Sequence, residues 1–401
     1  MANEISISPK KYSLQTVSRI KELQAKAKAD KDTVSRFKVE IPNLTGTVDP
    51  NYADMDQLIE NMRQFELNRG GLSENSQRNL FSTLRSYLSY CARTDIEYPF
   101  PVDETLLYYW FIEMQLEEKK SFATLMARKN LMSVFLRLMG FEDPMKGNLI
   151  GVHFKSLKRD MAEKNQAAVV QKVAVPFRQE HLKKLIPMMC EHEKTGIRRL
   201  RDLCVMIIAY CTGLREGEVG TILRKNITSQ NGVVTIRRVV SKTSSAPISK
   251  SVVGEYARIL GEYLELVDIA INRHNDNPDS KIKLSESNTY IFSWIRDNGT
   301  FREGILPMPG ETIDRIFERA FISLNPELPS SHSERKKLRG TGVFWTGHSG
   351  RVGAVIDAKV LYRMNEPELM AIGDWTNMAT VMRYLRATGH LEASNITIQN
   401  A

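Results

Sequence analysis

The chain reads Gly347-His348-Ser349-Gly350-Arg351 in its second half. An imidazole exchanges a proton near neutral pH, and a guanidinium keeps its charge while its planar fork grips two oxygen atoms of an anion. A single arginine is more often part of a surface salt bridge, so this stretch gains meaning only beside other reactive side chains. The sequence places such side chains both before and after it.

Three further clusters lie in the same half of the chain. They are Arg215-Glu216-Gly217-Glu218, Ser241-Lys242-Thr243, and Gly373-Asp374-Trp375 with Met382-Arg383-Tyr384 after it. Together with the first stretch they supply two arginines, a lysine, a histidine, an indole N–H and a tyrosine. This set can hold a phosphodiester, attack it with a phenol and protonate the departing oxygen. The sequence therefore predicts a phosphoryl-transfer site that cuts and rejoins DNA.

Two arginines, the tyrosine and the histidine carry the predicted chemistry. In-line attack on a phosphodiester spreads negative charge over its oxygens, so we expect Arg215 and Arg351 to stabilise that charge. A phenol with a pKa of about 10 is ionised in roughly one molecule per thousand at pH 7. Tyr384 therefore needs a proton acceptor, and His348 fits that role.

Three other residues have supporting roles, each with a plainer alternative. Lys242 lies in a turn between two β signals, from which an ammonium can protonate a departing 5′ oxygen; otherwise it is a solvated turn lysine. Trp375 can donate one N–H to a phosphate oxygen, although a tryptophan at a helix start is usually a core residue. Glu218 lies three residues after Arg215 and shares its helix face, where it is expected to orient a neighbour.

Composition limits the classes of partner and site. The length of 401 residues predicts two or three domains, and the 42% of hydrophobic residues is enough to form their cores. The net charge of +9 favours a polyanionic partner. The four cysteines form no CxxC pair, which is typical of buried thiols in a reducing compartment. We therefore expect a cytoplasmic protein, associated with the nucleoid if bacterial. We expect no membrane span, metal or other cofactor, because the sequence lacks long apolar runs and the HExxH, paired-cysteine and GxxxxGKS motifs.

Periodicity divides the chain into four parts. Residues 1–50 are polar and basic and predict a mobile arm, whereas 51–162 have helical spacing throughout. Residues 163–177 lose that spacing and predict a linker. Residues 178–401 then form a second domain, which carries all the reactive clusters and ends in a short tail.

Helix and strand signals are spread over both domains. Ser73 has the character of a helix N-cap, and the stretch Arg198–Tyr210 predicts a buried helix. Two β signals, at 233–236 and 246–248, flank Lys242. Further helices are expected at Asp103–Glu118, Phe122–Met139, Val253–Asn272, Glu311–Ser323, Arg351–Tyr362, Pro367–Ile372 and Met378–Arg386.

In the first domain, the helix faces opposite the apolar stripes are basic or polar. Such faces fit the major groove of DNA, and a solvated helix face is the alternative. The candidate contacts are Arg78 and Arg85 on one helix and Thr124, Arg128 and Lys129 on another.

Three stretches of the second domain resemble the motifs of tyrosine site-specific recombinases, the phage integrase family, in their Cre-type form. Thr212–Glu218 resembles the first arginine box, and Trp345–Ala354 is similar to the histidine–arginine box. Gly373–Asn377 with Val381–Arg386 resembles the tryptophan–tyrosine segment. The resemblance covers roughly residues 55–390, and only its second-domain motifs are specific. The long leading arm and the short tail after Tyr384 depart from the pattern.

The resemblance implies a mainly α fold, a two-domain C-shaped DNA clamp with an N-terminal helical bundle and a mostly helical catalytic domain containing a small β-hairpin. It implies that Tyr384 forms a 3′-phosphotyrosine link without any cofactor, and that the released 5′ end attacks the link of the partner strand. Glu311, Asp314 and Arg315 lie on a helix similar to the family's groove-reading helix. The catalytic set that the resemblance implies is Arg215, Lys242, His348, Arg351, Trp375 and Tyr384, with Glu218 in support.

The resemblance also implies an assembly. Two protomers would bind one double-stranded DNA site through inverted half-sites, and four would bring two sites together and exchange strands through a Holliday junction. The same residues fit a type IB topoisomerase or a telomere resolvase, which differ in assembly and product. A DNA-binding accessory protein without catalysis is the third alternative, and the complete reactive set counts against it.

Overall fold

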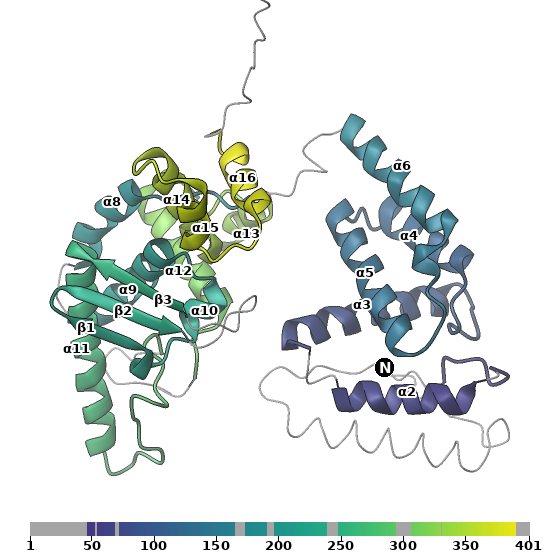
Figure 1. Cartoon of the computed structure of the whole chain (residues 1–401), viewed down its shortest axis with the longest axis horizontal. Coiled ribbons are helices and arrows are strands. Elements are labelled where there is room, and N and C mark those ends of the chain that lie inside the picture. The colour runs from purple at the N-terminus through teal and green to yellow at the C-terminus, as the bar shows by residue number, and fades with distance from the viewer. Residues whose placement is uncertain are drawn as a thin grey trace, which may run out of the picture. The chain divides into compact units, whose positions relative to one another are not determined.

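The computed structural model describes residues 46–52, 54–68, 72–164, 173–190, 196–238, 248–293, 306–329 and 331–389. The chain divides into two compact units, Met1–Lys172 and Val173–Ala401. Helices dominate both units, which confirms the mainly α fold class, and the strands form one small sheet in the second unit (Figure 1).

The first unit is a helical bundle. Its elements are α2 (Met55–Asn68), α3 (Glu74–Arg93), α4 (Glu104–Leu116), α5 (Phe122–Leu138), the 3-10 helix η2 (Pro144–Lys146) and α6 (Asn148–Lys164). Ser73 caps α3 as expected, because its hydroxyl accepts a hydrogen bond from the backbone N–H of Ser76 (3.2 Å). The core is aromatic: Tyr87, Phe100 and Trp110 are fully buried, with ring centroids of Tyr87 and Trp110 5.4 Å apart.

Residues in the expected arm and in the expected linker pack into the two cores. Val48 is buried and forms a parallel bridge with Phe100, so part of the stretch expected as a mobile arm packs in the core. Residues 1–45 lie outside the described residues, as do 165–172 of the expected linker. Phe177, at the end of that expected linker, is fully buried in the second unit, and its N–H donates to the carbonyl of Ser349 (3.0 Å).

The second unit is built around α9 (Gly196–Thr212), which is buried from Leu200 to Tyr210, as the apolar sequence predicted. Helix α9 and the neighbouring α11 (Gly254–Asp276) pack against a three-stranded sheet and bury its apolar side (Figure 1). The other helices are α8 (Gln179–Cys190), α10 (Glu216–Gly220), η3 (Arg224–Asn226), α12 (Gly310–Leu324), α13 (His332–Thr341), α14 (Gly347–Val360), α15 (Glu366–Ile372) and α16 (Met378–Ala387).

The sheet is antiparallel in the order β1 (Ile227–Gln230), β2 (Val233–Arg238) and β3 (Ile248–Val253). A two-residue turn joins β1 and β2, in which Asn231 and Gly232 both have positive φ (51° and 72°). That turn sets the register, with Gln230 opposite Val233. The turn between β2 and β3, residues 239–247, lies outside the described residues, and Lys242 with it.

Asp357 ties the start of the second unit to α14 and α9. Its buried carboxylate accepts hydrogen bonds from Arg178 Nε (2.7 Å), the backbone N–H of Gln179 (2.7 Å) and the hydroxyl of Tyr210 (2.8 Å). Burial and the neighbouring Asp357 raise the pKa of Tyr210, so its hydroxyl stays protonated and donates. A buried carboxylate with three donors holds three elements in one geometry.

Asp357→Ala should lower the free energy of unfolding by about 3–5 kcal/mol, because it leaves buried donors without their acceptor. Urea denaturation followed by circular dichroism measures the change. Asp279→Ala, at an exposed position, is the matched control and should shift the midpoint little. Equal midpoints for the two variants would contradict the role of Asp357.

Candidate active site

The hydroxyl of Tyr384 and the imidazole of His348 face each other. Tyr384 comes from α16 and His348 from the first turn of α14, and the atoms Nε2 and Oη are 3.0 Å apart. Tyr384 is only 5% exposed, so solvent reaches its hydroxyl sparingly. Burial lowers the pKa of His348; Glu216 opposes the shift, and Arg351 and Arg215 add to it. A neutral imidazole beside a phenol can accept the phenol's proton.

Arg351 is the most enclosed cation of the site. It is 2% exposed, and its two terminal nitrogens donate to the carbonyls of Gly213 and Gly373. The guanidinium carbon lies 4.4 Å from the centroid of the Trp375 ring, in cation–π contact. Burial, together with the charge of Arg215, lowers the pKa of Arg351 to about 10, so the group stays charged at neutral pH.

Two glycines allow close packing of the segments that bind Arg351. Gly213 has φ +61°, and a Cβ there would lie 2.6 Å from the carbonyl oxygen of Ile372. A Cβ on Gly373 would lie 2.5–2.7 Å from three atoms of the Trp375 ring. Segments 212–215 and 371–375 therefore pack backbone to backbone, and the guanidinium of Arg351 joins them.

Arg215 precedes α10 and is held by Glu218. One carboxylate oxygen of Glu218 accepts from the backbone N–H of Arg215 (2.9 Å), and the other accepts from its Nη1 (2.9 Å). The side chain of Arg215 is 30% exposed and that of Glu218 is 10% exposed. A single carboxylate thus holds both the backbone and one guanidinium nitrogen of Arg215, which restricts the directions in which the partly accessible guanidinium can donate.

The rings around the tyrosine form one continuous group. Trp375 is 9% exposed, and its centroid is 5.8 Å from that of Tyr384. The guanidinium carbon of Arg383 lies 5.6 Å from the centroid of the Tyr384 ring. The sequence analysis predicted no role for Arg383, the neighbour of Tyr384. Its charge also lowers the pKa of His348.

The structure brings together five of the predicted site residues, which are Arg215, His348, Arg351, Trp375 and Tyr384, and Glu218 contacts Arg215. Lys242 lies outside the described residues. Sequence reasoning missed Lys250 on β3, whose ammonium reaches the backbone before Trp375. A lone lysine in a strand carries no pattern that would have singled it out.

The candidate DNA contacts on α12 differ in their surroundings. Glu311 and Arg315 are exposed. Asp314 is half-buried, and its carboxylate accepts from the backbone N–H of Gly347 (2.8 Å) at the start of α14, with a pKa raised by burial. Asp314 thus helps to position the turn that carries His348, and its contact with DNA stays a prediction.

The candidates of the first unit also differ from one another. Arg78 and Arg85 are exposed on α3. The hydroxyl of Thr124 lies 2.9 Å from that of Ser121 at the start of α5. Arg128 donates to the hydroxyl of Ser86 (2.7 Å). The ammonium of Lys129 lies 4.9 Å from the ring centroid of Phe154, and burial lowers its pKa. All five remain predicted contacts.

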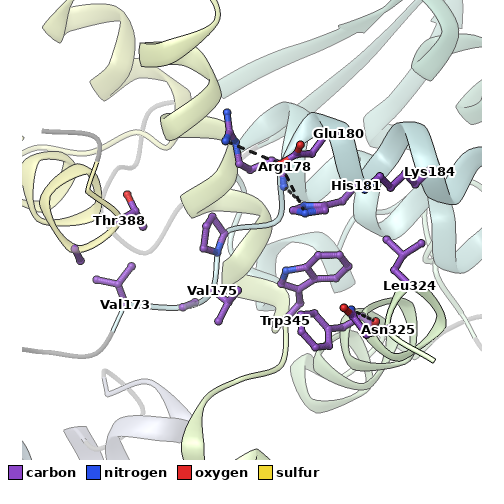
Figure 2. Close-up of a pocket in the computed structure, with 14 residues that line it drawn as sticks. Val173, Val175, Arg178, Glu180, His181, Lys184, Leu324, Asn325, Trp345 and Thr388 are labelled. Carbon is purple, nitrogen blue, oxygen red and sulfur yellow. Dashed lines mark hydrogen bonds and ion pairs between the residues drawn. The ribbon is translucent and has the colours of Figure 1, made fainter. Parts of the chain in front are cut away.

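A separate cavity of about 650 Å³ opens elsewhere on the second unit (Figure 2). Trp345 and His181 line it, with ring centroids 4.6 Å apart, and His181 Nδ1 accepts from the backbone N–H of Arg178 (2.9 Å). None of the reactive side chains described above is among its lining residues. Within the described ranges, no three His, Cys, Asp or Glu side chains gather as a metal site, and no helix there could span a membrane.

Gly373→Ala should displace the Trp375 indole while the fold persists, since overpacking typically costs about 1–3 kcal/mol. The chain has four tryptophans, so nitrogen-15 spectra should show one moved indole N–H signal. Gly217→Ala, where a Cβ would meet nothing within 4 Å, is the control. Four unmoved signals in Gly373→Ala would contradict the packing described here.

No family model matches the chain. Recombinase Cre of Escherichia phage P1 is 22% identical over 342 residues, which span 84% of this chain and 91% of Cre. Two structures of XerH site-specific recombinase bound to difH DNA superpose with TM-scores of 0.51 and 0.50, at 13% and 14% identity, covering 93% and 92% of this chain and 94% and 93% of theirs. The chain is therefore similar in sequence to a Cre recombinase and shares the fold of the XerH recombinase structures.

Proposed function

We propose that this protein is a site-specific DNA recombinase that cuts and rejoins DNA through a phosphotyrosine at Tyr384. The observation that carries the proposal is the 3.0 Å contact between His348 Nε2 and the Tyr384 hydroxyl, beside the buried charge of Arg351. A nucleophile, a proton acceptor and an anion-stabilising group converge there from α16 and α14.

Cleavage forms one bond and breaks one. The Tyr384 oxygen attacks the phosphorus, and its proton passes to His348. The bond from phosphorus to the 5′ oxygen breaks, and Lys242 supplies the proton that makes a 5′ hydroxyl. The DNA is then joined to Tyr384 through its 3′ phosphate. Rejoining is the reverse, with a 5′ hydroxyl as nucleophile, so phosphodiester energy is conserved and neither a metal nor ATP is needed.

The arginines stabilise the charge on the phosphate. Arginine has five N–H donors, and Arg351 uses two of its terminal groups on the Gly213 and Gly373 carbonyls. Its other N–H groups serve the phosphate, as do those of Arg215 that Glu218 does not take. Because these donors are oriented before DNA binds, they need no rearrangement during attack. Trp375 covers Arg351 and completes the set as a further N–H donor.

The proposal extends to the assembly and the DNA. Strand exchange requires a second cleaved site, so we propose dimers on inverted half-sites that pair as a tetramer and exchange strands through a Holliday junction. The first unit and α12 would contact the double helix. The net charge of +9 suits a polyanionic partner. The protein would act wherever its DNA lies, in the cytoplasm or nucleoid.

Covalent trapping tests the proposal. Wild type, Tyr384→Phe and the control Tyr362→Phe, which alters an exposed tyrosine on the same unit, are incubated with a random pool of nicked duplexes and denatured in SDS. Wild type and Tyr362→Phe should retain DNA attached by its 3′ end, and Tyr384→Phe none. DNA retained by Tyr384→Phe would exclude Tyr384 as the nucleophile.

The pH dependence of cleavage follows from His348. Its pKa lies below the ordinary value of about 6.5, so the imidazole is neutral and able to accept a proton above that value. The single-turnover cleavage rate should stay level as the pH falls to about 6.5, and decrease only below it as the imidazole becomes protonated. His348→Gln should be slow and should lack this decrease, whereas His181→Gln should keep the wild-type profile. A decrease that begins well above pH 6.5 would contradict the assignment.

A further inference from the structure

We infer that Lys250 is a positioning residue for the cleavage reaction: its ammonium fixes segment 371–375 to β3 and thereby sets where Gly373 and Trp375 meet Arg351. The inference rests on the proposed function, since it concerns the same site. Lys250 lies in the middle of β3, opposite Ile236 of β2, and its side chain is 15% exposed.

The ammonium of Lys250 has three acceptors. Its Nζ lies 2.5 Å from the carbonyl oxygen of Ala371, 3.0 Å from that of Ile372 and 3.0 Å from Oδ1 of Asp374. An ammonium has three N–H donors, so these acceptors can occupy all of them. Lys250 is thereby committed to the protein backbone and a carboxylate.

Segment 371–375 requires such a partner for two reasons. The short helix α15 ends at Ile372, where the last carbonyls lack intrahelical partners and carry partial negative charge. Asp374 then adopts φ +52°, the left-handed region that costs most residues energy. Lys250 satisfies the carbonyls and holds the Asp374 carboxylate, so it stabilises both the helix end and the reversal that follows.

Along segment 371–375, residues that bind Lys250 alternate with residues that contact Arg351. Ile372 and Asp374 bind Lys250, and the carbonyl of Gly373 between them accepts from Arg351. The next residue, Trp375, covers the guanidinium. The Ile372 carbonyl also lies against Gly213, whose own carbonyl binds Arg351. A shift of segment 371–375 would therefore move both the hydrogen bond and the indole that orient Arg351.

Hydrogen exchange measured by mass spectrometry tests the contacts without DNA. Lys250→Met should speed hydrogen exchange in the peptide covering 371–377, whereas Lys250→Arg should change it less. This peptide includes the backbone N–H of Trp375, which donates to the carbonyl of Met370. Lys225→Met removes an exposed lysine of the same unit and should leave this peptide unchanged. Equal exchange in Lys250→Met and wild type would overturn the inference. If Lys250→Met does not fold, Asp374→Asn and Lys250→Arg give the same comparison.

Cleavage rates test the consequence, using the duplex recovered by trapping and saturating protein in single turnover. Lys250→Met should cleave about 10- to 100-fold more slowly, the loss expected when hydrogen bonds to a charged group no longer orient the site. Lys250→Arg should recover most of the rate, and Lys225→Met should match wild type. The double variant Lys250→Met/Asp374→Asn should lose less than the product of the two single losses, because both changes break the same ion pair. A wild-type rate in Lys250→Met would overturn the positioning role.

A sulfur leaving group separates positioning from proton donation. DNA with a 5′-bridging phosphorothiolate releases a thiolate, which needs no proton. Lys242→Ala should regain wild-type speed on this DNA, and Lys250→Met should remain slow because Arg351 is still misplaced. Recovery of Lys250→Met would show that Lys250 is the proton donor and overturn the inference. If wild type yields no adduct on any DNA, the proposed function fails, and the exchange data alone decide the Lys250 contacts.

Discussion

The buried guanidinium of Arg351 is the constraint on which the site depends. A charge removed from water costs several kcal/mol unless it is hydrogen-bonded and paired, and Arg351 meets that cost with two backbone carbonyls and the face of Trp375. The carbonyls belong to Gly213 and Gly373, which stand just before Arg215 and Trp375 in the chain. By satisfying its own hydrogen bonds, Arg351 aligns the segments that carry both.

Helix α14 is the common support for these contacts. Its first turn presents His348, its second Arg351, and further along Asp357 binds the backbone and side chain at the start of α8. Asp314 holds its N-terminus through Gly347. Helix α14 therefore carries His348 and Arg351 and also holds the segment that enters the second unit. Displacement of α14 would change both the stability of the second unit and the geometry of the site. The free energy of unfolding should therefore be measured for each variant whose cleavage rate is measured.

Much of this could be predicted from local sequence. Helices such as α5 and α11 follow apolar periodicity, and Ser73 caps α3 as its type suggests. The strand β1 was missed because it has four residues and one buried side chain, although the Asn231-Gly232 pair after it was a hairpin signal. The contacts of Lys250 with Asp374, of Asp314 with Gly347 and of Arg128 with Ser86 could not be predicted, since these partners lie 33 to 124 residues away. The candidate reactive groups could be predicted from residue type. Which polar groups stay accessible depends on tertiary packing, which the local sequence does not contain.

Identification of the attached amino acid is the most direct test of the account. After trapping, wild-type protein is digested with protease and nuclease, and the modified peptide is sequenced by mass spectrometry. The proposed mechanism predicts a nucleotide joined through its 3′ phosphate to Tyr384 alone. Attachment to any other residue, or through a 5′ phosphate, would contradict the geometry built around His348 and Arg351.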